Sequence, residues 1–336
     1  MIPKEPLPFR RFRKRCLAAL GLRCLTPEDQ RCGNPNGVAA VSVVRNELLR
    51  LPSFLEHYRR LGVARFFVIE NNSTDGTADY LARQPDVCLY TTKQSFELKE
   101  AWIDLLLRRH AMKRWSVVVD ADELLDYPES GSLGLEGLCS YLHARGFNAL
   151  HAILLDLYPD GPLEEMDYKA GEDYFQRIWY FDPPDRLLKV PRSFGAGAGL
   201  DYRFAGGMRE RVFGIRNCCS KFPLLRFRAD MFLHDGQHYI ERARIADLRA
   251  VLYHFKYLQD FAPRAVEESV RGEHWNGASE YKEYARVAGG SDSILLLRDS
   301  NSLRYNGSMQ MENLGVMLRT EDFRTFLESK GSAATA

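Results

Sequence analysis

The sequence lacks long hydrophobic runs. No stretch approaches the roughly 18 consecutive apolar residues that a membrane-spanning helix needs, so we expect no transmembrane segment. The beginning of the chain is basic and has no long apolar core ahead of a small-residue cleavage site, so we expect no signal peptide. Together these features predict a cytoplasmic protein.

Cysteine is scarce and is not arranged for disulfides or zinc. The seven cysteines are an odd number, and no CxxC pair occurs among them. Structural zinc sites and redox dithiols commonly use such pairs. We therefore expect free thiols in a reducing compartment. They are Cys16, Cys24, Cys32, Cys88, Cys139, Cys218 and Cys219.

Glycine-rich phosphate loops are also missing. The chain contains neither GxGxxG nor GxxxxGK[ST], the motifs of dinucleotide-binding folds and of P-loop nucleotidases. A phosphate ligand would therefore be held without a glycine cradle, which favours a metal ion in that role.

The charge is nearly balanced overall but unevenly spread. The net charge of +1 argues against a nucleic-acid partner held by the whole surface. Residues 1–36 hold eight Lys/Arg against three Asp/Glu, a net charge of +5, which leaves 1 − 5 = −4 for the remainder. We expect residues 1–36 to form a mobile basic arm and linker. Such an arm is either a solvated tail or a peripheral contact with the anionic inner face of the membrane.

What the sequence does have is a regular alternation of strand and helix patterns up to about residue 130. Alternating strands and helices predict a mostly parallel sheet with helices on both faces, and ligands in such sheets bind at the carboxyl ends of the strands. Short β-branched or aromatic runs predict strands at 38–44, 65–69, 87–90 and 116–119, and helical patterns lie at 52–61, from 77, and at 99–114.

The most informative stretch follows the strand predicted at 116–119. Asp120, Asp122 and Glu123 stand at its end, and unpaired carboxylates are too costly to bury. In extended geometry Asp120 and Asp122 point the same way, which suits Mg²⁺ or Mn²⁺. The alternative is a solvated acidic turn.

The second half is less regular. We expect a strand at 149–157, surface loops at 159–185, and a mobile glycine-rich segment at 195–207. The predicted organisation is an arm at 1–36, a main domain at 37–262 divided at 130/131, a helical extension at 263–328, and a disordered tail at 329–336.

Six motifs in order resemble glycosyltransferase family 2-like proteins of the GT-A fold, in the bacterial branch with a VRNE motif after its first strand. The resemblance covers about residues 38 to 262. It implies an α/β, Rossmann-related mixed sheet flanked by helices, with a C-terminal helical extension. The motifs are VVRNE at 43–47, FLEHYRRLGV at 54–63, NNSTDGT at 71–77, VDADE at 119–123, GGMRER at 206–211 and HFK at 254–256.

The resemblance implies transfer of a sugar from a UDP- or GDP-sugar to a hydroxyl of a carbohydrate or lipid-linked acceptor, as in polysaccharide biosynthesis, with inversion. The divalent cation, Mn²⁺ or Mg²⁺, would lie on Asp120 and Asp122, completed by His254 or His238. Lys256 would pair with the diphosphate. The residues implied near the donor nucleotide are Arg45, Asn46, Glu47, Glu70, Asn71 and Asp120.

The catalytic base is less clearly marked, because the Glu-Asp pair usual in the family is missing. Glu210 follows a glycine pair that could clamp the acceptor, and Asp235 lies in a turn between two histidines. We favour Glu210, with a salt bridge to Arg209 or Arg211 as the alternative.

Two other functions share some of these features. A haloacid-dehalogenase-like phosphatase also places DxD after a strand, but that family has Thr or Val where this chain has Leu124, and its motif lies near the domain start. The other alternative is a nucleotide- or sugar-binding domain without catalysis, supported by the missing Glu-Asp pair.

Overall fold

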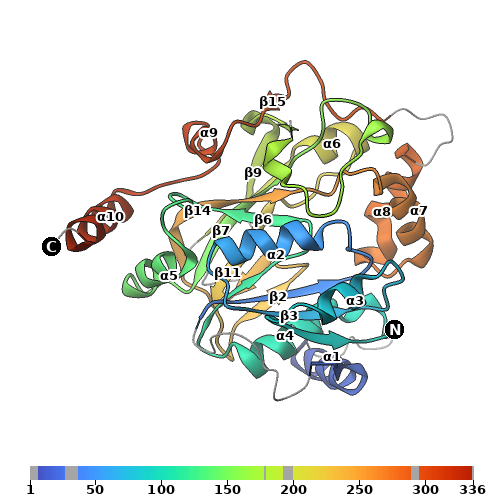
Figure 1. The fold of residues 1–336 in the computed structure, drawn as a ribbon, viewed down its shortest axis with the longest axis horizontal. Coiled ribbons are helices and arrows are strands. Elements are labelled where there is room, and N and C mark those ends of the chain that lie inside the picture. Colours follow the sequence, from blue (N-terminus) through green and yellow to red (C-terminus); the bar gives the residue numbers. More distant parts are fainter. Residues whose placement is uncertain (1–6, 27–36, 178, 192–199, 289–294, 335–336) are drawn as a thin grey trace.

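A nine-stranded mixed sheet forms the centre of the computed structural model, which describes residues 7–26, 37–177, 179–191, 200–288 and 295–334 (Figure 1). The α/β class with a mixed sheet flanked by helices is confirmed. The strand order is β1 (Arg23–Cys24), β4 (Val87–Thr91), β3 (Arg65–Glu70), β2 (Ala39–Val44), β5 (Trp115–Val118), β11 (Ser220–Arg226), β7 (Ala149–Asp156), β14 (Ile245–His254) and β6 (Glu123–Asp126).

Six of these strands point the same way. β2 is parallel to β3 and β5, β3 is parallel to β4, and β7 is parallel to β14. β11 is antiparallel to both β5 and β7, so the strands on its two sides are parallel to each other. The carboxyl ends of β4, β3, β2, β5, β7 and β14 therefore meet at one edge, which is where ligands bind in open α/β sheets.

The sheet is buried on both faces, as its continuous apolar strands predict. Successive strand residues alternate between two cores: Val44 and Phe66 belong to one, Val41 and Phe67 to the other. α2 (Leu51–Arg60) and α5 (Leu135–Ala144) contribute to the first core, and α4 (Lys99–His110) to the second.

The start of the described chain is folded onto the sheet, so the predicted mobile arm is wrong for residues 7–26. α1 (Leu7–Gly21) packs against α4, with Ala18 fully buried, and β1 pairs with β4. Arg11 reaches Glu241 at 3.1 Å. The apolar residues Ala18 and Leu22 pack on the second core, and this contact outweighs the local excess of charge. Residues 1–6 and 27–36 of the predicted arm lie outside the described residues.

The second half adds smaller elements around the sheet. Part of the predicted mobile segment is strand β10, and 195–199 lies outside the described residues. The tail predicted to be disordered is helical to residue 334. The remaining elements are α3 (Thr77–Ala82), β8 (Tyr180–Phe181), β9 (Leu187–Pro191), β10 (Tyr202–Gly206), α6 (Met208–Phe213), β12 (Phe232–His234), β13 (Tyr239–Glu241), α7 (Phe261–Arg271), α8 (Trp275–Ala288), β15 (Leu303–Arg304), α9 (Ser308–Asn313), α10 (Glu321–Ala334), and 3-10 turns at Phe96–Leu98, Leu163–Glu165, Tyr174–Gln176 and Pro184–Arg186.

Two features of the composition carry over to the structure. Within the described ranges, no helix combines the length and apolarity needed to cross a bilayer. The six cysteines that the structure describes are all free thiols, as predicted, and Cys32 lies outside the described residues.

The C-terminal helices α7 and α8 pack on each other and contact the carboxyl edge of the sheet (Figure 1). Arg264 of α7 forms an ion pair with Glu47 after β2. Arg271 Nη2 donates to Asn71 Oδ1 after β3 at 2.9 Å. The helical pair therefore brings additional cations to the edge where a ligand is expected.

The docking of α1 can be tested at Ala18. A carboxylate there must either be buried without a cation or force α1 off α4, so Ala18→Asp should lower the free energy of unfolding by about 1–3 kcal/mol. Ala19→Asp is the matched control, because Ala19 is exposed on the same helix. Chemical denaturation measures both. Equal stability of the two variants would show that α1 does not contribute to the folded domain.

Candidate functional site

The strand order brings together carboxylates and a histidine that lie far apart in the sequence. Asp120 and Asp122 lie in the turn between β5 and β6, and Glu123 is the first residue of β6. Asp156 ends β7 and His254 ends β14, and the parallel register places these two residues side by side. The antiparallel register of β6 places Glu123 opposite His254. Backbone pairing alone therefore collects the cluster at the carboxyl edge.

His254 lies between two carboxylates. Its Nε2 is 3.1 Å from Asp122 Oδ2 and its Nδ1 is 2.6 Å from Asp156 Oδ1. Burial opposes the charged imidazole, but the two carboxylates outweigh burial and raise the pKa of His254. Burial also opposes both carboxylates, yet His254 lowers the pKa of Asp122, and Arg209 with His254 lowers that of Asp156 to about 2.

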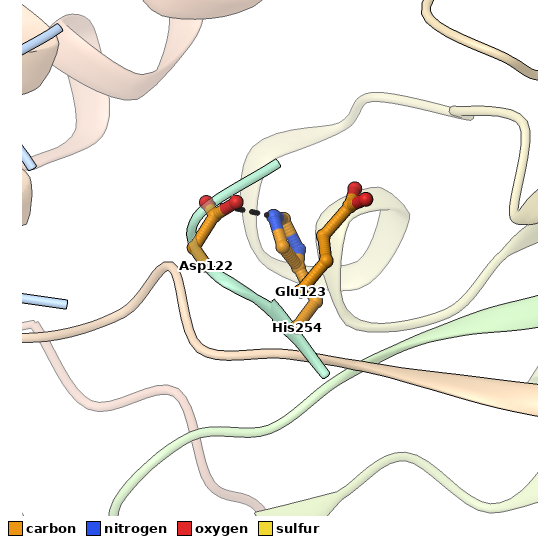
Figure 2. Close-up of side chains that lie close together, drawn as sticks. All are labelled: Asp122, Glu123 and His254. Atoms are coloured by element: carbon orange, nitrogen blue, oxygen red, sulfur yellow. Dashed lines mark hydrogen bonds and ion pairs between the residues drawn. The ribbon is translucent and has the colours of Figure 1, made fainter. Parts of the chain in front are cut away.

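This geometry is that of a histidine oriented by a second carboxylate. Asp156 accepts a hydrogen bond from Nδ1 of His254. The Nε2 atom of the same ring is therefore directed toward Asp122 (Figure 2). Metal-binding histidines commonly use such a partner to fix the ring and its tautomer. Asp156 was not predicted from the sequence, where it is a single carboxylate within the apolar strand expected at 149–157.

A metal-ligand set is present at this point. One ligand atom each from Asp122, Glu123 and His254 lie within 4.8 Å of one another, and no other such trio occurs in the described part of the chain. Two carboxylates and an imidazole suit Mn²⁺, or Mg²⁺ if the carboxylates dominate. The donor chemistry therefore fits the predicted divalent cation, with Glu123 in place of Asp120.

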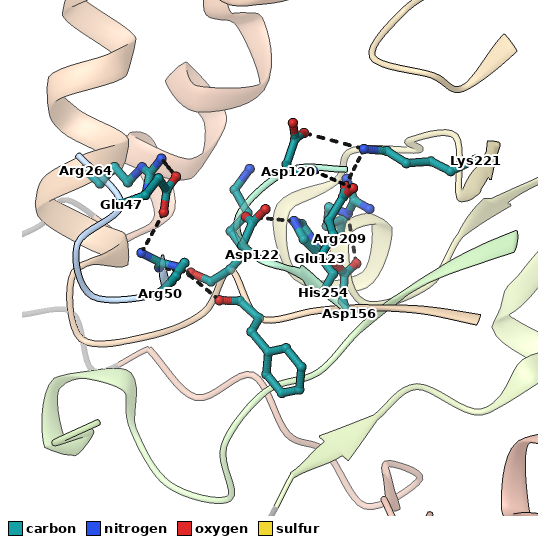
Figure 3. A network of polar contacts seen from close by, with 12 residues as sticks. Glu47, Arg50, Asp120, Asp122, Glu123, Asp156, Arg209, Lys221, His254 and Arg264 are labelled. Carbon is teal, nitrogen blue, oxygen red and sulfur yellow. Dashed lines mark hydrogen bonds and ion pairs between the residues drawn. The ribbon is translucent and has the colours of Figure 1, made fainter. Parts of the chain in front are cut away.

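Asp120 is held by lysines rather than by the trio. Lys99 Nζ is 2.6 Å from Asp120 Oδ1, and Lys221 Nζ is 3.6 Å from Oδ2. Burial opposes its charge, but the two lysines lower the pKa of Asp120 to about 2. Lys221 also forms an ion pair with Glu123, shown in Figure 3. Lys221 was not predicted from the sequence; it lies in β11, whose sequence SKFPLLR also contains Arg226.

Two further cations lie near the cluster, the buried Arg209 and the half-buried Lys256. Arg209 is 4% exposed; its Nε donates to Asp156 Oδ2 at 2.9 Å, and its Nη2 is buried without a hydrogen-bond partner. Lys256 lies over the rings of Tyr281 and Tyr284, at 4.6 and 5.0 Å. A buried guanidinium nitrogen without a partner is costly, so this position favours an anionic ligand.

The residues predicted near the donor nucleotide all make contacts within the protein. Arg45 donates to the carbonyl groups of Asn71 and Asn72, and Asn46 Oδ1 accepts from Thr74 N at 2.8 Å. Glu70 is buried and accepts from Thr91 Oγ1 at 2.9 Å.

Glu47 and Asn71 are likewise engaged. Glu47 is buried between Arg264 and Arg50, and burial raises its pKa despite these cations. Asn71 Nδ2 donates to the carbonyl groups of Thr92 and Gln94. These side chains shape the carboxyl edge, and their contact with a nucleotide remains a prediction.

Three other predicted residues lie outside the trio. Glu210 forms an ion pair with Arg216 and not with Arg209 or Arg211, the partners expected from the sequence. Arg216 Nε donates to Glu210 Oε1 at 2.7 Å. Asp235 is exposed in the β12–β13 turn. His238 Nδ1 is 2.8 Å from the Ser220 carbonyl, and burial lowers the pKa of His238 to about 3. No described contact joins any of the three to Asp122 or His254, so the catalytic roles of Glu210 and Asp235 stay predictions.

Comparisons with known proteins give only distant likenesses. No protein-family profile matches the chain. No curated protein matches it either. UTP-bound UGPase from Acinetobacter baumannii matches with 9% identity and a TM-score of 0.28 over 51% of this chain and 66% of that chain, just under two thirds.

Two further solved structures are similar to this chain at equally low identity and TM-score. A 4-diphosphocytidyl-2C-methyl-D-erythritol synthase matches with 16% identity and a TM-score of 0.26 over 54% of this chain and 81% of that chain. A UDP-glucose pyrophosphorylase complexed with UDP-glucose matches with 10% identity and a TM-score of 0.27 over 74% and 87%. TM-scores this low carry no argument about activity, so any assignment rests on the geometry of the site.

Asp122 can be tested as a metal ligand. Asp122→Asn removes one charged ligand, so it should weaken Mn²⁺-dependent binding of UDP or GDP by at least about tenfold to a hundredfold, as measured by calorimetry. Asp79→Asn, an exposed carboxylate on α3, is the control. The same nucleotide affinity in both variants with Mn²⁺ present would remove Asp122 from the ligand set.

Proposed function

We propose that this protein is a divalent-cation-dependent glycosyltransferase that moves a sugar from a UDP- or GDP-sugar to a hydroxyl group of a carbohydrate or lipid-linked acceptor. The observation that carries the proposal is the trio of Asp122, Glu123 and His254 at the carboxyl edge of six parallel strands, beside the buried Arg209 and the half-buried Lys256. Carboxylates for a metal next to cations for an anion are what a nucleoside diphosphate requires.

The diphosphate is the leaving group of the proposed reaction. Mn²⁺ or Mg²⁺, when bound, would neutralise negative charge as the nucleoside diphosphate departs. Arg209 would offer its unpartnered Nη2 to a phosphate oxygen, and Lys256 would act as a point charge beside it. Asp156 fixes both Arg209 and His254, so that both side chains are in place before the substrate binds.

The acceptor hydroxyl needs a base on the opposite face of the sugar. Glu210 remains our proposal for this base, with Asp235 as the second choice. The ion pair of Glu210 with Arg216 would have to open before the carboxylate could accept the proton of the acceptor hydroxyl. Gly206 gives Glu210 its room: its φ is +105°, and a Cβ there would come within 3.0 Å of Glu210 Oε2. Attack from that face gives an inverted product.

The donor nucleotide is proposed to lie at the ends of β2 and β3. Arg45, Asn46, Glu47, Glu70 and Asn71 would contact its base and ribose. A nucleotide placed there would replace the contacts that α7 makes with this edge, which are those of Arg264 with Glu47 and of Arg271 with Asn71.

A panel of UDP- and GDP-sugars tests the proposal. Ligand at about 100 times its dissociation constant stabilises a protein by about 2.7 kcal/mol, so the true donor should raise the melting temperature, and should do so only with Mn²⁺ or Mg²⁺. The rise should disappear in Asp122→Asn.

Hydrolysis of the same donor then separates a transferase from an inactive binding domain. A transferase should release sugar slowly to water when no acceptor is present, and a binding domain should release none. If no nucleotide sugar stabilises the protein under any metal condition, the proposal is wrong.

We also propose that the protein works at an anionic membrane surface, through α1. Phe12, Leu17 and Leu20 are 57%, 45% and 85% exposed, although they belong to a helix that is docked on the domain. Arg13 and Lys14 are exposed beside them, and α1 contains no acidic residue. Exposed apolar side chains flanked by cations suit a bilayer with acidic lipids, and such a site would meet a lipid-linked acceptor.

Sedimentation with lipid vesicles tests this contact. The protein should bind vesicles that contain phosphatidylserine and not vesicles of phosphatidylcholine alone. Leu20→Glu should weaken binding to the vesicles by about tenfold or more, because it replaces an apolar side chain that would insert into the bilayer by an acidic group. Val270→Glu is the matched control, since Val270 is 84% exposed on α7. Equal binding of the two variants would exclude α1 as the contact.

A further inference from the structure

Lys221 is a buried cation whose role the proposed reaction does not explain. It is 3% exposed and comes from β11, at the point where the pairing of β11 with β7 shifts register. Its ammonium group forms an ion pair with Glu123 and lies 3.6 Å from Asp120 Oδ2. Lysine is almost never fully buried unless it is paired, so the acidic turn is what holds it there.

Each carboxylate of the cluster already has a protein cation. Lys99 and Lys221 form ion pairs with Asp120, Lys221 also forms one with Glu123, and the other pairs lie around His254 (Figure 3). None of these carboxylate oxygens is among the buried atoms without a partner in the described residues, whereas Arg209 Nη2 is. The remaining pairs are Asp122 with His254, and Asp156 with His254 and Arg209.

This pairing of charges bears on whether the metal ion binds alone or together with the nucleoside diphosphate. A free dication would meet carboxylates that already have protein partners, and it could reach Glu123 only by displacing or opposing the ammonium of Lys221. An anion would meet an unpartnered guanidinium nitrogen. The cluster therefore favours a metal that arrives together with negative charge over a bare metal ion.

We propose that Lys221 is an internal counter-ion that competes with the divalent metal at Glu123 and so couples metal binding to the nucleoside diphosphate. The coupling to the diphosphate rests on the proposed function. The competition between Lys221 and the metal does not, because it concerns only this chain and the ion.

Mn²⁺ binding, followed by the loss of the electron paramagnetic resonance signal of free Mn²⁺, tests the competition without any turnover. Lys221→Met should bind Mn²⁺ alone at least about tenfold more tightly than the wild type, because one positive charge near the ion is removed. Lys221→Arg keeps the charge and should stay close to the wild type. Lys113→Met, an exposed lysine elsewhere, is the control.

Coupling is read from the same titration with UDP or GDP present. The diphosphate should increase Mn²⁺ affinity strongly in the wild type and much less in Lys221→Met. Equal Mn²⁺ affinities of the wild type and Lys221→Met, without nucleotide, would overturn the proposal and leave the glycosyltransferase assignment standing. If the expected Mn²⁺ affinities are found but no nucleotide sugar is turned over, the competition between Lys221 and the metal stands and the glycosyltransferase assignment is wrong.

Because Lys221→Met leaves Glu123 unpaired, the variant could lose stability. Mn²⁺ should then raise its melting temperature by more than it raises that of the wild type, since the ion replaces the missing charge. The double variant Glu123→Gln/Lys221→Met removes both partners and should lose the gain in Mn²⁺ affinity. A gain that persists in the double variant would show that Glu123 is not where the lysine and the metal compete.

Discussion

The structure depends on the withdrawal of several carboxylates from water at one edge of a sheet. Glu123 and Asp156 are buried and Asp120 and Asp122 are half-buried, and a carboxylate withdrawn from water is tolerated only with a cation and hydrogen bonds. Each of them has a partner from another element of the chain, and Lys221 and His254 each contact two of the carboxylates. The requirement for charge compensation therefore determines which segments must meet at this edge.

This requirement ties the two halves of the protein together. The acidic turn belongs to the first half, while Lys221, His254 and Arg209 come from β11, β14 and α6 of the second. Removing one partner of such a pair leaves an uncompensated charge, which typically costs about 3–5 kcal/mol. The network is therefore expected to specify the arrangement of the halves as well as the chemistry of the site. The ion pair of Arg264 with Glu47 extends the same principle to the C-terminal helices.

The network would also be preorganised for the anion of the proposed substrate. The side chains that would face a phosphate are fixed before it binds: Asp156 holds Arg209, and the rings of Tyr281 and Tyr284 support Lys256. Preorganised cations in a dry site interact with phosphate more strongly than the same groups in water.

The sequence by itself determined the repeating part of the fold and the position of the acidic turn. Apolar runs and helical periodicity depend on neighbouring residues, so the strands through Val118 and the helices between them were predicted within a few residues. The placement of Asp122 at a strand end, and the expectation that His254 returns to it, followed from the same local pattern and from the motif resemblance.

Only the tertiary structure decided which groups compensate which charges. Asp156 and Lys221 were not recognised from the sequence, and Arg209 was considered only as a partner of Glu210, because the roles of these residues depend on the order of β5, β11, β7 and β14 in the sheet. The docking of α1 was missed for a similar reason: its charge suggested a solvated arm, but Ala18 and Leu22 pack onto a helix some 80 residues away in the sequence. Burial and charge pairing are long-range properties, and a sequence pattern reports only what lies within a few turns of the chain.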